Sequence, residues 1–383
     1  MTPFGIVLPG RILFGRGEAA RAPERIAALG RRGILVHGAS AARAAWLTEA
    51  LEDRAEVLAL SCAAEPDLAA VIAGTEEARR FRPDWVAAIG GGAALDFGKA
   101  IAALVSVVTP VTDHLEVVGR GLPLSAAPLP FVALPTTAGT GAEATRNAVI
   151  GLPEHGRKVS LRDDRMMPRL AIVDPALTDH CPKGVTLASG LDAVVQVIEP
   201  YVSTRANPFT DAVSWPAIGQ GFRALARLMQ GEDAAARDAM AWVSLSGGIA
   251  LSNGALGAVH GLAGPIGGLC GAAHGAICGA LLAPVLAANR RLARGAVAER
   301  LDLVCTEIAR ELGCNPVDAP EALGDWIADL GLPDLSAQGL SPDRHEAIAR
   351  AAISSSSMKG NPVALDEAQL VAILQSASRL RGA

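Results

Sequence analysis

The stretch Trp-Val-Ala-Ala-Ile-Gly-Gly-Gly-Ala-Ala-Leu-Asp at residues 85–96 carries the clearest fold signal in the chain. Residues 85–89 have the continuous apolar pattern of a buried strand, and residues 94–105 have the pattern of a helix. The three glycines between them would let a phosphate approach the backbone without meeting a Cβ atom, while free N–H groups at the helix start would bind it. Tight turns also use glycine, and the segment is neither a G-x-G-x-x-G fingerprint nor a Walker loop. The strand before it and the helix after it favour phosphate binding.

Strands and helices alternate on both sides of this stretch. Further strands are predicted at residues 33–37, 57–60 and 131–134, and further helices at residues 41–55 and 67–81. Such alternation predicts a parallel α/β sheet with right-handed crossovers.

A second loop, Leu-Pro-Thr-Thr-Ala-Gly-Thr-Gly-Ala-Glu at residues 134–143, also follows a predicted strand. Its three threonines and two glycines suit contacts with ribose and phosphate oxygens, although a polar surface turn could have the same composition. Since the carboxyl ends of parallel strands meet at one sheet edge, both loops are expected to converge on one ligand.

The pattern changes after about residue 174. From Pro182 onward there is no convincing strand, and apolar residues recur at helical spacing, for example at residues 234–250 and 297–312. We therefore predict a nucleotide-binding α/β domain over residues 1–178 and an all-helical metal and substrate domain over residues 179–383. A cleft between the two would be the natural ligand site.

Three ionisable side chains stand out in the apolar helical half. Asp192 and Gln196 are four residues apart and so share a helix face. A buried carboxylate is costly unless it is paired or binds a cation, although an Asp in a first helical turn would be stabilised by the helix dipole. His260 and His274 are both flanked by small residues. Either histidine alone is typical of a helical core, but two imidazoles and a carboxylate suit Zn²⁺ or Fe²⁺.

Composition narrows the class of protein. Half of the 383 residues are hydrophobic and 19% are charged, with a net charge of −5, so neither disorder nor nucleic-acid binding is expected. Prolines and histidines interrupt the apolar run at residues 254–288, and the N-terminus lacks a secretory signal pattern, so we expect a soluble cytoplasmic protein. The six cysteines form no C-x-x-C pair and are interpreted as small buried hydrophobic residues.

Taken in order, the motifs resemble those of the iron-containing (group III) alcohol dehydrogenase family. The matching elements are Gly90-Gly91-Gly92 with Asp96 and Lys99, residues 135–143, residues 173–178, Gly190-Leu191-Asp192 with Glu199, His260, and His274-Gly275. The resemblance extends from about residue 11 to residue 362, which is nearly the whole chain.

This resemblance implies a dehydroquinate synthase-like architecture and reversible hydride transfer between NAD or NADP and an alcohol or carbonyl carbon. A divalent metal, Fe²⁺ or Zn²⁺, would polarise the carbonyl oxygen. Small alcohols, aldehydes, ketones or oxo-acids would be the substrates, and the enzyme is expected to be a homodimer.

The resemblance also assigns roles to individual positions. Asp192, His260 and His274 would be catalytic and would bind the metal, with Gln196 at the fourth ligand position. The cofactor would be held by Gly91, Gly92, Ala93, Asp96, Thr136, Thr137, Thr140 and Lys158.

Three positions depart from the family pattern. Gln196 replaces a histidine ligand, which predicts weaker metal binding or a site that could lack metal. Gly264 replaces the histidine assigned to proton relay, and Gly38 stands near the place of an acidic residue that repels the 2′-phosphate of NADP.

Several alternatives therefore remain. A maleylacetate reductase-like enzyme would reduce oxo-acids without metal, with Arg146 or the region of Arg120 anchoring the acid. A lyase resembling dehydroquinate synthase would need several basic residues, and lysine is scarce near the polar positions of the helical half. A non-catalytic nucleotide-binding protein would result if Gln196 and Gly264 disable the site.

Overall fold

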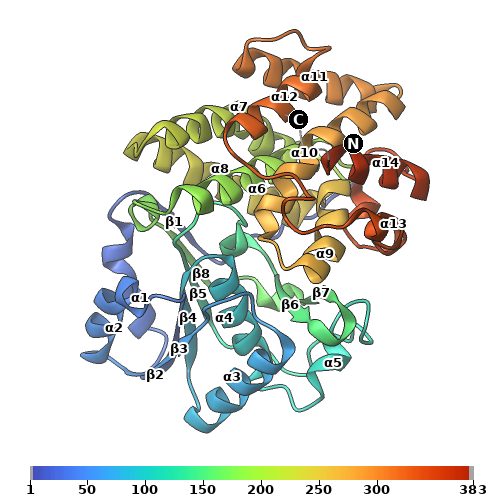
Figure 1. Cartoon of the computed structure of the whole chain (residues 1–383). Helices are drawn as coiled ribbons and strands as arrows, with labels where there is room; N and C mark the ends of the chain where they lie inside the picture. The colour runs from blue at the N-terminus through green and yellow to red at the C-terminus, as the bar shows by residue number, and fades with distance from the viewer. Residues whose placement is uncertain (1–2, 379–383) are drawn as a thin grey trace. The chain divides into compact units, whose positions relative to one another are not determined.

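A computed structural model describes residues 3–378 of the chain (Figure 1). These residues form two compact units. The α/β unit comprises residues 7–137 and 141–179, and the helical unit comprises residues 3–6, 138–140 and 180–378. The two short segments 3–6 and 138–140 thus belong to the helical unit, although they precede it in sequence.

Six parallel strands form the sheet of the α/β unit, in the order β1-β8-β5-β4-β2-β3. Their bounds are β1 (Ile12–Phe14), β2 (Arg32–His37), β3 (Glu56–Ser61), β4 (Trp85–Gly90), β5 (Phe131–Pro135) and β8 (Leu170–Val173). In β4, Ile89 pairs with His37 of β2 on one side and with Leu134 of β5 on the other. The predicted parallel α/β sheet is confirmed.

Helices cover both faces of this sheet. They are α1 (Ala22–Ala27), α2 (Ala45–Glu52), α3 (Leu68–Phe81) and α4 (Gly92–Leu104), followed by the short α5 (Val111–His114). Along β4, Val86 and Ala88 pack in a core with residues of α3 and α4, whereas Trp85, Ala87 and Ile89 pack in a second core with residues of α1 and α2. Figure 1 shows these helix pairs on opposite sides of the sheet. Burial on both faces explains why β4 is continuously apolar.

Some elements differ from those predicted. The single helix expected at residues 41–55 is a 3₁₀ turn, Ala41–Arg43, followed by α2. The sequence interpretation also missed β1, β8 and an antiparallel hairpin of β6 (Asn147–Leu152) and β7 (Arg157–Arg162). Gly156, with φ 56°, makes the left-handed turn that this hairpin needs.

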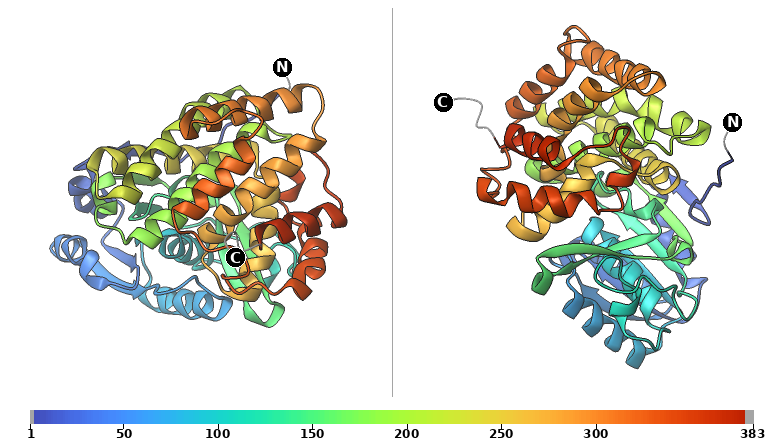
Figure 2. Two further views of the ribbon diagram at one scale, coloured as in Figure 1. Left: turned by 45° about the horizontal axis from the view of Figure 1, so that its top comes forward. Right: turned by 90° about the vertical axis from the view of Figure 1, so that its right-hand side faces the viewer.

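The helical unit contains only helices, turns and loops among residues 180–378, as predicted (Figure 2). Its α-helices are α6 (Lys183–Val202), α7 (Pro208–Gln230), α8 (Ala234–Gly254), α9 (Ala258–Cys270), α10 (His274–Leu292), α11 (Ala296–Leu312), α12 (Ala319–Asp329), α13 (His345–Ile353) and α14 (Glu367–Ala377). No helix in the described part of the chain is long and apolar enough to cross a membrane.

Helix α6 is the centre of the helical unit and packs against α7, α8 and α10. Gly275, at the start of α10, allows the closest approach to α6. A Cβ atom at Gly275 would lie 2.3 Å from the carbonyl oxygen of Ala188. A side chain larger than hydrogen would therefore push apart the two helices that carry Asp192 and His274.

Candidate functional site

One face of α6 carries three buried polar side chains. Asp192, Gln196 and Glu199 occur at spacings of four and three residues, so they share that face, and they are only 1%, 2% and 4% exposed. Asp192 lies well inside α6, which begins at Lys183. The alternative interpretation of Asp192 as a first-turn residue stabilised by the helix dipole is therefore wrong.

Both predicted histidines lie beside Asp192. His260 is in the first turn of α9, and its Nε2 atom is 3.4 Å from Oδ1 of Asp192. His274 is the first residue of α10, and its Nε2 atom is 3.9 Å from the same oxygen. The imidazole rings are 5.4 Å apart between centroids. Imidazoles from two different helices thus converge on one carboxylate oxygen.

Glu199 orients His260. Its Oε2 atom is 2.7 Å from Nδ1 of His260, and its Oε1 atom accepts the backbone N–H of Val259 at 2.7 Å. A carboxylate at Nδ1 favours the proton there and leaves Nε2 free to face Asp192. The sequence interpretation noted Glu199 only within a motif and gave it no role. Its spacing of seven residues from Asp192 on one helix was the available signal.

Cys278 is a second residue at the site, although the sequence interpretation treated it, like the other cysteines, as a small buried hydrophobic residue. Its Sγ atom is 3.6 Å from Nε2 of His274, one helical turn earlier in α10. Ligand atoms of Asp192, His260, His274 and Cys278 all lie within 4.8 Å of one another. We call these four residues the polar cluster. The sequence signal was the spacing of four between His274 and Cys278.

The polar cluster is arranged to hold positive charge. Burial alone would raise the pKa of Asp192, but the neighbouring imidazoles of His260 and His274 keep that pKa below its ordinary value. Burial would also lower the pKa of His274, but Cys278 and Asp192 raise it to about 9. Burial would likewise lower the pKa of His260, but Cys278 and Glu199 raise it above its ordinary value. A divalent cation could therefore replace protons in this environment.

Unpaired oxygen atoms give a separate indication of a cation site. Oδ1 of Asp192 and Oε1 of Gln196 are buried and have no hydrogen-bond partner. Leaving such atoms unpaired is costly, and a cation bound at Asp192 would satisfy its Oδ1 atom. Two imidazoles, a carboxylate and a thiol are also the donor types that Zn²⁺ accepts. The residues present thus fit a metal ion.

The two predicted phosphate-binding loops are adjacent in the α/β unit. Gly91 is the N-cap of α4, and Gly92 and Ala93 are its first residues. A Cβ atom at Gly91 would lie 3.3 Å from Oγ1 of Thr137, and the N–H of Thr136 donates to the carbonyl of Gly90. The loops meet because β4 and β5 are parallel neighbours. Thr140 belongs to the helical unit.

Asp96 and Lys158 have partners within the α/β unit. Asp96 accepts the N–H of Val149 at 3.0 Å and pairs with buried Lys99 at 3.2 Å. Lys158, on β7, forms an ion pair with Glu65. Asp96 thus links α4 to β6 through a hydrogen bond. The ammonium group of Lys158 could contact a ligand in addition to Glu65.

Two of the three positions that depart from the family pattern, Gly38 and Gly264, have open space around them. A Cβ atom at Gly38 or at Gly264 would meet no other atom within 4 Å. Arg146 pairs with Asp164 at 2.6 Å, and Arg120 pairs more distantly with Asp113 at 4.0 Å. Both arginines proposed as oxo-acid anchors therefore already have acidic partners.

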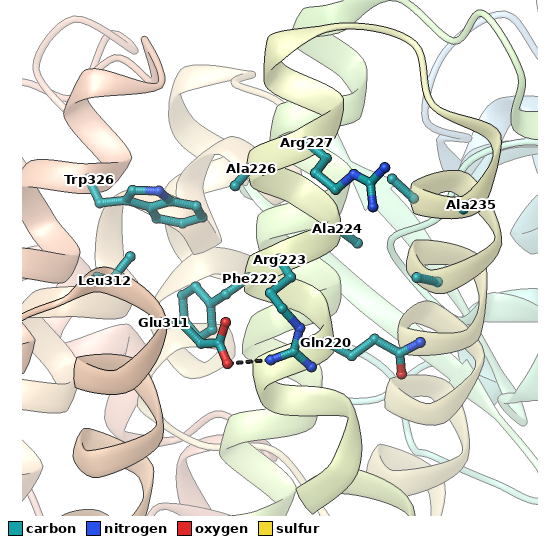
Figure 3. Close-up of a pocket in the computed structure, with 12 residues that line it drawn as sticks. Gln220, Phe222, Arg223, Ala224, Ala226, Arg227, Ala235, Glu311, Leu312 and Trp326 are labelled. Atoms are coloured by element: carbon teal, nitrogen blue, oxygen red, sulfur yellow. Dashed lines mark hydrogen bonds and ion pairs between the residues drawn. The ribbon is translucent and has the colours of Figure 1, made fainter.

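A pocket of about 400 Å³ lies elsewhere in the helical unit (Figure 3). Residues of α7, α8, α11 and α12 line it, including Trp326 and the ion pair of Arg223 with Glu311. Figure 3 shows both charged side chains beside the pocket, and its lining includes no residue of the polar cluster. We therefore assign it no part in the chemistry.

Comparison with known proteins agrees with the motifs. Family models described as iron-containing alcohol dehydrogenase and as the C-terminal part of that family match residues 9–175 and 186–378. The chain is 33% identical to the probable alcohol dehydrogenase EutG of Salmonella typhimurium, over 82% of this chain and 78% of that protein. It is 33% identical to alcohol dehydrogenase 4 of Schizosaccharomyces pombe, over 97% of this chain and 88% of that protein.

A solved structure of a 1,3-propanediol oxidoreductase is similar throughout. It has a TM-score of 0.89 and 28% identity, and the match covers 98% of this chain and 100% of that chain. The expected combination of an α/β part with a parallel sheet and a helical part is thus confirmed. The chain belongs to the iron-containing alcohol dehydrogenase family and is an oxidoreductase that transfers a hydride, with metal assistance, between a nicotinamide cofactor and an alcohol or carbonyl carbon.

Proposed function

We propose that the enzyme interconverts small uncharged alcohols and aldehydes at a metal ion held by Asp192, His260 and His274. The convergence of both imidazoles on the Asp192 carboxylate supports this proposal most strongly. When bound, the metal supplies Lewis-acid stabilisation of negative charge on the substrate oxygen. Glu199 keeps His260 in the tautomer that can bind metal. Gln196, expected at the fourth ligand position, lies one helical turn after Asp192 with its Oε1 atom buried.

The nicotinamide cofactor would bind to the α/β unit at the loops that follow β4 and β5. Backbone N–H groups of Gly91, Gly92 and Ala93 would receive the pyrophosphate, because they lie at the start of α4. Thr136, Thr137 and Thr140 would contact the phosphates and the nicotinamide ribose. Lys158 would add positive charge, and Asp96 would hold the start of α4 in position.

Both NAD and NADP should be accepted. An acidic residue after β2 would repel a 2′-phosphate, and Gly38 occupies this region with open space around it. The absence of a carboxylate at Gly38 removes this discrimination but adds no group that selects NADP. We therefore expect a dual-cofactor enzyme.

Uncharged substrates are favoured over oxo-acids by the charges at the site. The side chains gathered around Asp192 are imidazoles, a thiol, an amide and the Glu199 carboxylate. The carboxylate of an oxo-acid substrate would need a cationic side chain to balance its charge. The two arginines considered for this role, Arg146 and Arg120, are paired with aspartates. The similar proteins named above include alcohol dehydrogenases and a propanediol oxidoreductase.

A substrate screen tests the proposal. Purified enzyme is stripped with a chelator, reloaded with Fe²⁺ or Zn²⁺, and assayed with NADH and NADPH against short aldehydes and oxo-acids. Metal-dependent reduction of aldehydes is expected, and His274→Ala should abolish it. Reduction of oxo-acids alone, at equal rates with and without metal, would overturn both the substrate class and the role of the metal.

We further propose a cytoplasmic homodimer. All six cysteines are free thiols, which suits a reducing compartment. Light scattering of the purified protein would reveal a dimer through its mass, and a monomer at assay concentration would contradict the proposed assembly.

A further inference from the structure

Cys278 occupies a position in the polar cluster that the iron-containing family pattern does not assign. We propose that the Cys278 thiolate is the fourth protein ligand of the metal ion, in the role expected of Gln196, and that it shifts the metal preference from Fe²⁺ toward Zn²⁺. This inference rests on the proposed metal-assisted function and adds to it a ligand and a metal.

The distances within the polar cluster agree with tetrahedral coordination. Metal bonds of about 2.0–2.1 Å to nitrogen or oxygen and about 2.3 Å to sulfur imply ligand separations of roughly 3.3 Å between N or O atoms and 3.6 Å between S and N. Sγ of Cys278 is 3.6 Å from Nε2 of His274, and Nε2 of His260 is 3.4 Å from Oδ1 of Asp192. The separation of Nε2 of His274 from Oδ1 of Asp192 is 3.9 Å, and all four ligand atoms lie within 4.8 Å of one another. Small side-chain shifts would bring all four atoms around one ion.

The position of Cys278 on α10 holds the thiol at the site. Cys278 follows His274 by one helical turn, so both side chains lie on the same face. The cysteine is fully buried, and packing therefore restricts its rotamers. An imidazole and a thiolate four residues apart on a rigid helix form a preorganised pair of ligands.

Gln196 has a different role in this arrangement. It lies one helical turn after Asp192 and helps to lower the pKa of that carboxyl group. A neutral amide oxygen is also a weaker ligand for Zn²⁺ than a thiolate, because it carries no charge and Zn²⁺ is bound chiefly by N and S donors. We therefore assign Gln196 to positioning Asp192 and Cys278 to coordination.

Charge and softness determine the metal preference. The carboxylate of Asp192 and the thiolate of Cys278 together balance the charge of a divalent ion. Thiolate ligands favour Zn²⁺ over harder ions, and tetrahedral sites with mixed sulfur and nitrogen ligands are typical of zinc. Replacement of a histidine ligand by cysteine should therefore favour zinc relative to iron.

Cobalt spectroscopy tests the ligand without reference to turnover. The whole enzyme is stripped, loaded with Co²⁺, and compared with Cys278→Ser, Gln196→Ala and Cys305→Ser. Cys305 is a matched control because it is equally buried in the helical unit but lies outside the polar cluster. A thiolate-to-cobalt charge-transfer band is expected in the wild type, Gln196→Ala and Cys305→Ser, and it should be absent from Cys278→Ser.

The outcomes separate the two proposals. Bound Co²⁺ without a charge-transfer band in the wild type, or with a band that persists in Cys278→Ser, overturns the cysteine ligand while leaving metal-assisted catalysis intact. Failure of the wild type to bind Co²⁺ at all overturns both. If Cys278→Ser does not fold, X-ray absorption of the Zn²⁺-loaded wild type tests the cysteine ligand instead. The proposal requires a sulfur atom at about 2.3 Å from the zinc, and its absence would overturn the proposal.

Competition between metals tests the preference. Stripped enzyme is equilibrated anaerobically with equal Zn²⁺ and Fe²⁺, and the bound metals are measured. Cys278→Ser should lower the ratio of bound zinc to bound iron at least tenfold relative to wild type and Cys305→Ser. An unchanged ratio would overturn the preference.

Discussion

Oε2 of Glu199 lies 2.7 Å from Nδ1 of His260, and Glu199 is on the same helix face as Asp192. Helix α6 therefore supplies both the carboxylate that faces Nε2 of His260 and the carboxylate that faces Nδ1. The other oxygen of Glu199 accepts the N–H of Val259 near the start of α9. One side chain thus sets the tautomer of His260 and holds the helix turn that carries it.

Substitution of Glu199 should weaken metal binding without removing a ligand. Loss of a carboxylate that orients a metal-bound histidine typically costs 10- to 100-fold in metal affinity or activity. Glu199→Gln keeps an acceptor oxygen but loses the charge, so its loss should be smaller than that of Glu199→Ala. Metal affinity measured by competition with a chelator checks this order, with circular dichroism as the test of folding.

Equal affinities in both Glu199 variants and the wild type would contradict this role. An equal loss in both variants would indicate that the carboxylate charge matters and that the acceptor at Val259 does not.

The sheet could be predicted from sequence because its central strands are buried on both faces. Residues 85–89 are therefore continuously apolar, and glycines directly after them indicate the turn into a helix. The hairpin of β6 and β7 could not be recognised so easily. In β6, buried Ala148 and Ile150 alternate with exposed Val149, but the exposed residue is itself apolar, which hides the period of two.

The polar cluster could be predicted only in part. Asp192, His260 and His274 were identifiable because ionisable residues are rare in apolar helices. Cys278 was not, because cysteine is one of the most commonly buried residues and resembles a core residue in sequence. The contact between Cys278 and His274 becomes visible only in the folded chain. In the sequence, the only hints of Glu199 and Cys278 as site residues are their helical spacings, seven residues from Asp192 and four residues from His274.

Lys158 should contribute to cofactor binding, although it is paired with Glu65. The Glu65 side chain is 43% exposed, so solvent screens the pair and little energy is needed to separate it. Lys158→Met keeps the apolar stem and should raise the KM for NADH roughly tenfold, as expected for loss of a charged hydrogen bond of about 1.5 kcal/mol. Glu65→Gln should leave this KM unchanged or lower it.

Steady-state kinetics, with cofactor binding followed by fluorescence, measures both Lys158 and Glu65 variants. An unchanged KM in Lys158→Met would remove Lys158 from the cofactor site. A raised KM in Glu65→Gln would show instead that the ion pair itself is needed.

Gly38 should determine whether NADP is accepted. An introduced Asp side chain fits, because a Cβ atom at Gly38 meets nothing within 4 Å. Like charges placed close together cost several kcal/mol, so Gly38→Asp should lower kcat/KM for NADPH at least tenfold and change kcat/KM for NADH less than threefold. Gly38→Asn is the matched neutral control. An equal loss with both cofactors, or an equal loss in the Asn variant, would mean that bulk rather than charge is responsible.

Metal affinity should rise with pH up to about pH 9. Burial lowers the pKa of His274, but Cys278 and Asp192 raise it to about 9, so in the metal-free protein this imidazole holds a proton below that pH. A metal ion requires neutral imidazole and must displace that proton, which makes binding weaker at lower pH. Each proton displaced contributes about a tenfold change in affinity per pH unit, by mass action.

Zn²⁺ affinity at pH 6, 7.5 and 9, corrected for the protonation of the competing chelator, measures this dependence. His274→Gln should bind more weakly at every pH and should lose the part of the slope that comes from His274. Since the raised pKa of His274 favours its protonated form, the Zn²⁺ affinity of the wild type must increase with pH from 6 to 9. A Zn²⁺ affinity that is flat over this range in the wild type would show that no proton competes with the metal at His274.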